Sequence, residues 1–498
     1  MYDQERLREL FPSTTVYKDP HVMAIFNAEK IESFLRDWII RRKADQDGRI
    51  TDFDNLSEYI QRIIPHKSEK ESLEDEARSQ GSTHPFLAKI NISFNAKHNY
   101  YCFEIPDLGF TTSDTMIEDY VWDRIKGEVL GEAGGWGLVK LGYNPPGNGL
   151  PGKFVLLDYT NFCPYEVNLE AFKEARRQIT DTEEWMDIIL GAIDYDASSF
   201  GSPNTPHDLV WKGKHTILTR LLPFIQPRIN LVELAPQETG KSYIFGKLSK
   251  YGWLAGGGSL SRAKLFLDMR AGAKTKGLVT FADYVAIDEI KSIKFTNDKE
   301  MAGILKGYME DGAVKVGNTK VEGEAGMIFL GNIDVEDMGS GHDMFKDLPE
   351  VFRDSALIQR VHGFVPGHYI PKISPNTIIT GWALNTEYFT EIMHLMRSSS
   401  ESIRFRGLVE NLVKITPPEG ERTSKREVEA VMRVSTAYMK LFFPHADNEL
   451  IKDEGFKEDF KKYCLDPAVE MQQTVLEQMK IINPNEFRSK NVARYEVQ

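Results

Sequence analysis

Apolar positions in the first part of the chain follow helical spacing. Within 28–65 the segments AEKIESFLRDWIIRRK and FDNLSEYIQRIIP predict two helices, the second ending at Pro65. From Phe86 the pattern changes to short runs rich in β-branched and aromatic residues, such as FLAKINISF and GKFVLLDY, separated by Asn, Pro and Gly. We therefore expect a β-rich unit over 86–160, a small barrel or sandwich with an OB-like fold among the alternatives.

The middle of the chain combines both patterns. Residues 229–370 alternate short apolar runs with helical ones, which predicts an α/β fold with a parallel sheet covered by helices on both faces. Residues 383–445 look helical again. The predicted division is an N-terminal helical region (1–80), a β-rich small barrel-like domain (81–165), a helical connector (166–225), a parallel-sheet core (226–370), a helical lid (371–445) and a charged C-terminal tail with helical patches (446–498).

Composition adds little beyond location. The chain has 498 residues and a formal net charge of −13, which argues against a basic surface but leaves room for a basic channel inside an acidic ring. It contains no apolar run near the ~20 residues that span a membrane, and its charged N-terminus lacks a signal core. With three widely spaced cysteines, we expect a cytoplasmic protein without a membrane partner.

The segment INLVELAPQETGKSYIFGKL predicts a phosphate-binding loop. An apolar strand precedes Gly240-Lys241-Ser242 and a helical pattern follows, which is the strand-to-helix turn that such loops require. Lys241 would reach the β- and γ-phosphates of ATP, and the Ser242 hydroxyl would hold Mg²⁺. Ala235 stands where the usual pattern has a glycine. The predicted nucleotide-binding residues are Ala235, Pro236, Thr239, Gly240, Lys241, Ser242 and Tyr243.

Polar residues end two further apolar runs. ADYVAIDEI ends in Asp288 and Glu289, and adjacent carboxylates at a buried strand end call for a cation or donors. We predict that Asp288 acts on the Mg²⁺ shell and that Glu289 polarises the attacking water. An exposed strand end followed by a helix cap is the alternative. GMIFLGNI ends at Asn332, which would orient that water or, alternatively, form a simple turn.

This order of motifs resembles the AAA+ superfamily, in which Asn332 would occupy a sensor position. SALIQRVHGFVPG resembles the segment that carries the arginine finger in helicases of the MCM type, so the resemblance implies a catalytic role for Arg360, with Arg353 as a nearby competitor. SKREVEAVMRVSTAYMK resembles the MCM lid helix, so Arg426 is expected to be the second sensor. Structural ion pairs are the alternative for both arginines.

From 226 to 370 the resemblance becomes closer. The segments KGLVTFADYVAIDEI, GYMEDGAVKVG and ALIQRVHGFVPG resemble the BrxL family of Lon-related AAA+ proteins in BREX phage-defence systems. The resemblance covers about 90–440. It implies a homo-oligomeric, hexameric ring, singly or in a stack, that hydrolyses ATP with Mg²⁺, binds double-stranded DNA and meets other BREX components. Residues 446–498 are too short for the Lon-protease-like domain of longer members, so protease activity is not expected.

Two segments are predicted to contact DNA. GAVKVGNTKVEG reads as a hairpin with its turn at Gly317-Asn318, and Lys315 and Lys320 flank the turn where MCM-type ATPases insert a pore hairpin. WLAGGGSLSRAK reads as a glycine-rich loop that would offer Arg262 and Lys264 to phosphates. Surface lysines and a plain flexible connection are the respective alternatives.

Two rival functions stay open. An AAA+ unfoldase, or a Lon-like regulatory ATPase, would act on protein, and Trp253 and Leu254 would suit its pore loop. A scaffold that does not hydrolyse ATP would explain Ala235, although Asp288, Glu289 and Asn332 argue against it.

Overall fold

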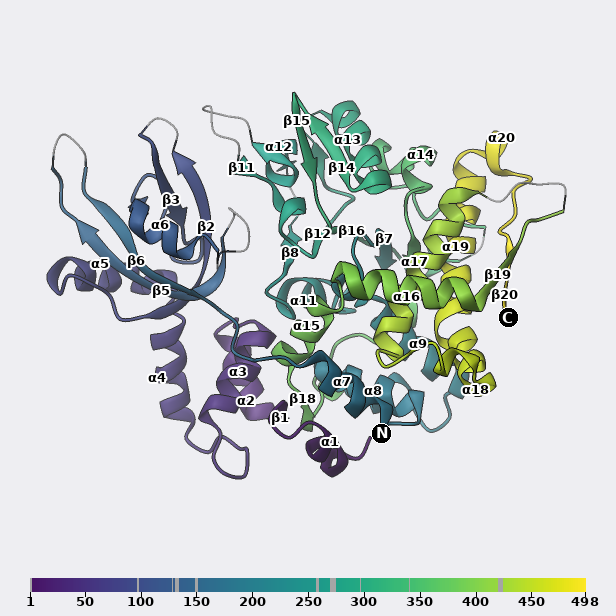
Figure 1. Ribbon diagram of the computed structural model, residues 1–498, viewed down its shortest axis with the longest axis horizontal. Helices are drawn as coiled ribbons and strands as arrows, with labels where there is room; N and C mark the ends of the chain where they lie inside the picture. The colour runs from purple at the N-terminus through teal and green to yellow at the C-terminus, as the bar shows by residue number, and fades with distance from the viewer. Residues whose placement is uncertain are drawn as a thin grey trace. The chain divides into compact units, whose positions relative to one another are not determined.

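The computed structural model describes residues 2–95, 98–127, 129, 134–147, 151–256, 259–268, 275–295, 297–339, 341–419 and 424–498. The chain forms two compact units, each discontinuous in sequence (Figure 1). The first unit comprises Met1–Arg42, Val167–Leu260 and Ala282–Gln498, and the second comprises Lys43–Glu166 and Ser261–Phe281.

A five-stranded parallel sheet forms the centre of the first unit, with the order β17-β7-β16-β12-β8. Its strands are β7 (Leu231–Ala235), β8 (Gly252–Ala255), β12 (Tyr284–Ile287), β16 (Gly326–Asn332) and β17 (Gly363–Val365). Every residue of β7 and β12 is buried, as the near-continuous apolar runs of these strands predict for a sheet covered on both faces. The prediction of an α/β fold with a parallel sheet is confirmed.

The order of the strands sets the geometry of the site. β16 lies between β7 and β12, and Figure 1 shows these three strands side by side. Ala235 at the end of β7 pairs with Asn332 at the end of β16. Because the strands are parallel, their carboxyl ends all lie at one edge of the sheet, where loops can bring their side chains together.

Helices make up most of the rest of the first unit. Several begin at a side-chain cap, such as Asp19, Asp181 and Asn385, whose oxygen accepts backbone N–H groups of the first turn. The helices are α1 (Gln4–Leu10), α2 (Pro20–Ala28), α3 (Ser33–Lys43), α7 (Leu169–Arg177), α8 (Thr182–Ala192), α9 (His207–Thr219), α10 (Leu222–Ile225), α11 (Lys241–Lys247), α13 (Asp298–Asp311), α14 (Ser355–Ile358), α15 (Thr386–Leu395), α16 (Ser399–Leu412), α17 (Lys425–Phe442), α18 (Glu454–Phe460), α19 (Asp466–Ile482) and α20 (Pro484–Phe487). The role of 371–445 as a lid stays a prediction.

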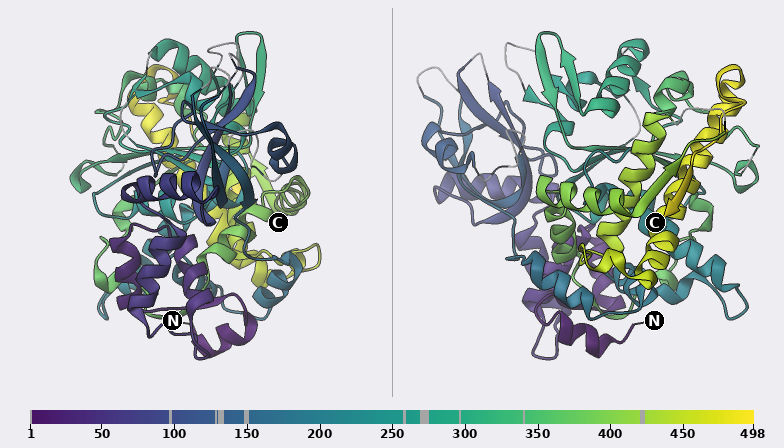
Figure 2. Two further views of the ribbon diagram at one scale, coloured as in Figure 1. Left: turned by 90° about the vertical axis from the view of Figure 1, so that its left-hand side faces the viewer. Right: turned by 45° about the vertical axis from the view of Figure 1, so that its right-hand side comes forward.

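Several short two-stranded ladders lie outside the central sheet. β1 (Thr15–Lys18) pairs with β18 (Gly381–Leu384), and β9 (Ser259–Leu260) pairs with β13 (Lys294–Phe295). β14 (Ala313–Val316) and β15 (Thr319–Glu322) form a hairpin. β19 (Val413–Thr416) pairs with the C-terminal β20 (Arg494–Val497), which can be followed in the right-hand view of Figure 2.

Residues 446–498, expected to be a charged tail with helical patches, contain helices that pack against the rest of the first unit. They form α18, α19, α20 and β20, and α19 packs against β17 and α17. Met471, Val475 and Met479 of α19 are buried at helical spacing. Among the residues between these three positions only Glu477 is charged, so this apolar face was readable from the sequence.

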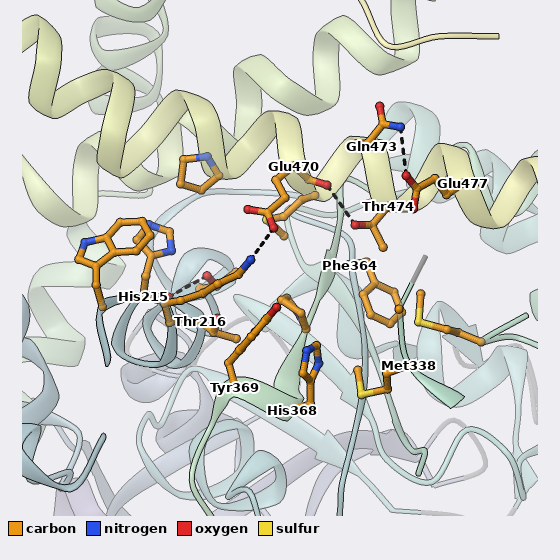
Figure 3. Close-up of a pocket in the computed structure, with 18 of the residues that line it drawn as sticks. His215, Thr216, Met338, Phe364, His368, Tyr369, Glu470, Gln473, Thr474 and Glu477 are labelled. Carbon is orange, nitrogen blue, oxygen red and sulfur yellow. Dashed lines mark hydrogen bonds and ion pairs between the residues drawn. The ribbon is translucent and has the colours of Figure 1, made fainter. Parts of the chain in front are cut away.

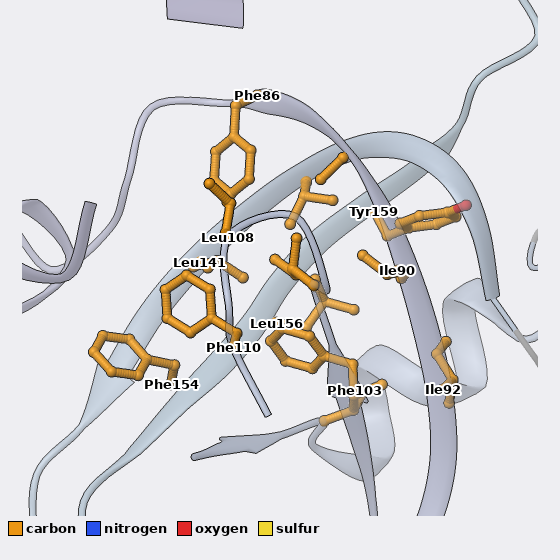
Figure 4. Close-up of a cluster of buried hydrophobic side chains, with 14 of the residues drawn as sticks. Phe86, Ile90, Ile92, Phe103, Leu108, Phe110, Leu141, Phe154, Leu156 and Tyr159 are labelled. Atoms are coloured by element: carbon orange, nitrogen blue, oxygen red, sulfur yellow. The ribbon is translucent and has the colours of Figure 1, made fainter. Parts of the chain in front are cut away.

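The second unit contains a five-stranded sheet with the order β3-β2-β5-β6-β4. Its strands are β2 (Phe86–Asn95), β3 (Tyr100–Glu104), β4 (Thr115–Met116), β5 (Gly134–Asn144) and β6 (Lys153–Asn161), and its helices include α4 (Phe53–Ile63), α5 (Lys70–Ser79) and α6 (Asp119–Ile125). An isolated bridge between Tyr101 and Ile117 also links the two edges of the sheet. Phenylalanines and aliphatic residues such as Phe86, Phe103 and Leu156 fill its core (Figure 4). An OB-like fold stays a prediction.

The segment WLAGGGSLSRAK is not the single loop that its glycines suggested. Trp253 and Leu254 belong to the edge strand β8, and Ser259 begins β9. Arg262 and Lys264 lie on the short helix α12 (Arg262–Leu265) of the second unit, which β10 (Leu267–Asp268) and β11 (Thr275–Lys276) follow. Gly257 and Gly258 lie outside the described residues.

Candidate active site

The predicted phosphate loop connects β7 to α11. The strand ends at Ala235, and the helix begins at Lys241 with Gly240 as its N-cap. Gly240 has a φ of 78°, in the left-handed region, and a methyl group there would collide with the hydroxyl of Tyr195 and with Ile373. Backbone conformation and packing therefore both require glycine at 240.

Ala235 fits the loop without strain. It is the last residue of β7, is completely buried and has a strand conformation. Its methyl group faces Gly367, where a Cβ atom would overlap it. The left-handed residue on this side of the loop is Glu238, with a φ of 66°. An alanine is therefore accommodated at 235, because its methyl group packs against Gly367 and the position needs no left-handed backbone.

The Lys241 ammonium is turned back onto its own loop. Its Nζ donates to the carbonyl oxygens of Ala235 (3.2 Å) and Pro236 (2.9 Å) and to Oδ1 of Asn332 (2.9 Å). Burial lowers the pKa of this ammonium; Glu233 opposes that effect most, Arg220 adds to it, and Asp288 opposes it less. These three acceptors are neutral oxygens. A bound phosphate would offer the ammonium a charged oxygen in their place, which makes a stronger hydrogen bond.

Ser242 and Asp288 lie side by side, as a shared Mg²⁺ would require. The Ser242 hydroxyl donates to Oδ2 of Asp288 over 2.6 Å. One hydroxyl and one carboxylate oxygen are the few protein ligands that Mg²⁺ takes when phosphates and water complete its octahedron. These residues therefore fit the metal, which would neutralise charge on the phosphates.

Glu289 has an unusual backbone conformation beside Asp288. Its φ is 52°, in the left-handed region, and its N–H donates to Oδ1 of Asp288 over 2.9 Å. The Glu289 side chain is exposed, while Asp288 is half-buried. The Asp288 carboxylate is thus bonded to Ser242, while the exposed Glu289 lines the cavity.

One cavity gathers most of the predicted residues, although Ala235 and Pro236 of the predicted nucleotide-binding set do not line it. Its volume is about 440 Å³, and it is lined by Gln237, Glu238, Thr239, Gly240, Lys241, Ser242, Tyr243, Asp288, Glu289, Asn332 and Ile373. The loop, the acidic pair and the asparagine come from three neighbouring strands of the sheet. The arrangement could hold a polyphosphate and a divalent cation next to a carboxylate base.

Tyr243 links this loop to a buried charged cluster. Its hydroxyl bonds the Asp194 carboxylate and lies 2.6 Å from the Ser33 hydroxyl. Arg36 and Lys18 also bind Asp194, each over 2.6 Å, and hold the pKa of that carboxyl well below its usual range despite burial. The buried Thr239 of the same loop accepts hydrogen bonds from Arg220 at its carbonyl oxygen and its hydroxyl.

Arg360 and Arg426 do not line the cavity. Both bind the carboxylate of Glu310, through Arg360 Nε at 2.8 Å and Arg426 Nε at 2.8 Å. Arg426 also donates to Oε1 of Gln359 over 2.9 Å. The two arginines predicted to be catalytic therefore lie together, away from the loop of their own chain.

The predicted hairpin is present. β14 and β15 are joined at Gly317 and Asn318, and Lys315 pairs with Lys320 across the strands. Both lysines are exposed on one face, while Val316 and Val321 on the other face are buried. Lys320 also forms an ion pair with Glu322. Of the other predicted DNA contacts, Lys264 is exposed and Arg262 is half-buried.

A second cavity of about 310 Å³ lies elsewhere in the first unit. Figure 3 shows Phe364, Met338 and His368 on one side and Glu470 of α19 on the other. Lys212 forms an ion pair with Glu470 over 2.8 Å. None of the site residues predicted from the sequence lines this cavity.

Sequence reasoning missed several residues around the loop. Tyr195 and Ile373 close over Gly240, and Glu310 binds both arginines. Glu233 lies buried within β7 and binds Arg220. A carboxylate inside an otherwise apolar strand was a usable signal for that pair, because a buried charge requires a partner.

The parallel sheet and the site at its carboxyl edge are consistent with the class of α/β proteins that carry an ATPase domain. The family model described as "Lon-like protease BrxL-like, ATPase domain" matches residues 154–493, and the model "BREX system Lon protease-like protein BrxL N-terminal" matches residues 9–143. The chain belongs to the BrxL family, and this membership supports an ATPase role.

Two curated relatives carry the name "Lon-like protease BrxL". The protein of Escherichia coli O9:H4 (strain HS) is 28% identical over 424 residues, which cover 84% of this chain and 56% of the relative. The protein of Bacillus cereus (strain H3081.97) is 29% identical over 428 residues, which cover 85% of this chain and 58% of the relative. The chain thus spans a little over half the length of these relatives. Across the described residues, no helix is both long enough and apolar enough to cross a membrane.

Proposed function

We propose that this chain is an ATPase that works with Mg²⁺ and assembles into a ring of identical subunits around duplex DNA in BREX-type phage defence. The observation that carries the ATPase part is the single cavity lined by Lys241, Ser242, Asp288, Glu289 and Asn332. Lys241 would bind the phosphates, and Ser242 with Asp288 would hold the metal. Glu289 would take the proton of the attacking water, which Asn332 orients.

The ring is supported by the pair of arginines at Glu310. An arginine that completes a site from a neighbouring subunit must lie away from the phosphate loop of its own chain, at a surface that can meet another copy. Neither Arg360 nor Arg426 lines the cavity of its own chain, and their side chains are 15% and 41% exposed. A hexamer fits the family resemblance.

Binding of duplex DNA is supported by the hairpin β14–β15. Like charges directly opposite each other across two strands are unfavourable, yet Lys315 and Lys320 occupy such a pair. A phosphate backbone would relieve this repulsion, and ring symmetry would repeat the pair around a channel. The proposal also includes other BREX components as partners and a location in the cytoplasm.

Action on protein is the less supported alternative. Trp253 and Leu254, which made that function attractive, lie in strand β8 and pair with Val285 and Ala286 of β12. An unfoldase that pulls through these residues would need them on a loop.

The test of the ATPase role is Glu289→Gln. Loss of the base should lower the rate of ATP hydrolysis by about 100-fold or more, with Mg²⁺-dependent binding of a fluorescent ATP analogue retained. Glu454→Gln, at an exposed carboxylate that pairs with Lys457, is the matched control and should change neither. Normal hydrolysis by Glu289→Gln would refute the assignment.

A further inference from the structure

Arg220 lies immediately after α9, and Glu233 lies in the middle of β7. Both side chains are completely buried. Arg220 Nε donates to Oε2 of Glu233 over 3.0 Å, and Nη2 donates to Oε1, so the pair is bidentate. Central positions of buried parallel strands normally hold aliphatic residues, and an apolar pair of similar size is often at least as stable as a buried ion pair.

The remaining donors of Arg220 reach the phosphate loop. Nη1 donates to the carbonyl oxygen of Thr239 over 2.6 Å, and Nη2 lies 3.2 Å from the Thr239 hydroxyl. Thr239 stands between Glu238 and Gly240, with φ values of 66° and 78°. A turn made of two left-handed residues around one central residue leaves its carbonyl without a helical or strand partner, and Arg220 supplies that partner.

The contact with the carbonyl also orients the next N–H group. The Thr239 carbonyl and the Gly240 N–H belong to one planar peptide unit and point in opposite directions. Because Arg220 is completely buried on the carbonyl side, the Gly240 N–H points outward, and Gly240 lines the cavity. An outward N–H in this loop is the kind of donor that surrounds phosphate oxygens.

We propose that Arg220, fixed by Glu233, is a positioning residue that holds the phosphate loop in its nucleotide-binding shape. The inference rests on the proposed ATPase function. A guanidinium suits the task because its planar fork serves Glu233 and Thr239 together, which an ammonium cannot do with the same geometry. We call the Arg220–Glu233 pair, with its bonds to Thr239, the clamp. It contacts the phosphate loop from residues outside the Gly240-Lys241-Ser242 motif, and Glu233 lies in the strand that ends at Ala235, where the usual pattern has a glycine.

The central test is the double substitution Arg220→Met with Glu233→Leu. It removes both charges and keeps an apolar filling, so the chain should fold with a melting temperature within a few degrees of the original. Loss of the clamp should raise KM for ATP at least tenfold and weaken binding of the fluorescent analogue to the same extent. A purely structural pair would leave both unchanged in the folded variant.

Two further variants sharpen the result. Arg220→Lys keeps a cation for Glu233 but loses the fork, so KM should rise although charge is conserved; it also serves if the double variant fails to fold. Lys250→Met with Glu387→Gln is the matched control, because that pair is equally buried, over 2.7 Å, and neither residue lines the cavity at the loop; Lys250 also pairs with Glu391 over 2.7 Å. The control should leave KM unchanged.

The outcomes separate the inference from the proposed function. If the original chain binds no nucleotide, the proposed function and the clamp both fail. If it binds ATP and both Arg220 variants bind it equally well with unchanged KM, only the clamp is refuted. A raised KM in both Arg220 variants, with the control unchanged, supports it.

Discussion

His215 shows how one buried side chain makes the fold depend on pH. Its ring stacks on Trp211 with centroids 4.9 Å apart, and Nε2 lies 2.9 Å from the Tyr463 carbonyl oxygen. Burial lowers the pKa of His215 to about 4 from an ordinary value of 6.5. The ring is therefore neutral in the folded chain at neutral pH, while an unfolded chain would protonate it below pH 6.5.

The sign follows from this difference in protons bound. Between pH 6.5 and 4 the unfolded state binds more protons, so His215 lowers the free energy of unfolding as pH falls, by about 3 kcal/mol at pH 4. His215→Gln keeps a donor and does not titrate. We expect the stability difference between original and variant, measured by urea unfolding, to change by this amount between pH 7 and pH 4. A stability difference that stays constant between pH 7 and pH 4 would contradict this prediction. The other histidines are present in both proteins, so their contributions cancel in the difference.

At the scale of elements, the hairpin β14–β15 carries the prediction for DNA. Lys315→Ala with Lys320→Ala removes a like-charged cross-strand pair, so the free energy of unfolding should not fall. Affinity for duplex DNA should fall, and the slope of log K against log salt should become shallower by about 1 for each lysine that contacts a phosphate. Filter binding at several salt concentrations measures both.

A matched lysine controls for the loss of one exposed, ion-paired lysine. Lys452 is 67% exposed and pairs with Glu449, much as Lys320 is 65% exposed and pairs with Glu322. Lys452→Ala should leave the salt slope unchanged. Equal slopes for the hairpin variant and this control would exclude the hairpin from DNA binding.

Elements also show what the sequence could and could not predict. The loop at Lys241, the carboxylates after Ile287 and the amide at Asn332 were predictable, because each follows a short apolar run that must end at the same edge of a parallel sheet. The clamp of Arg220 on Thr239 was not, since it joins a helix end to a loop through side-chain geometry. For the C-terminal helices only helical patches were predicted, although the buried face of α19 is apolar apart from Gln472 and Gln478.

At the scale of the whole molecule, the arginine pair at Glu310 predicts that activity needs two subunits. Arg360 lies at Glu310, with 15% of its side chain exposed, and does not line the cavity that contains Lys241. If Arg360 completes the site of a neighbour, Arg360→Ala should bind ATP normally and hydrolyse it at least about 100-fold more slowly. Lys241→Ala should bind ATP poorly and also be inactive.

Mixing these two inactive variants tests the shared site directly. In randomly mixed rings, about one interface in four joins an intact loop to an intact Arg360, so activity should return to about a quarter of the original. Arg353→Ala is the control, because Arg353 pairs with Asp343 over 3.2 Å and is the competing candidate. A mixture that assembles but stays inactive would show that Arg360 acts in the ATP site of its own subunit and not in that of a neighbour. If Arg353→Ala were inactive alone and regained activity when mixed with Lys241→Ala, while Arg360→Ala stayed active alone, the role would pass to Arg353.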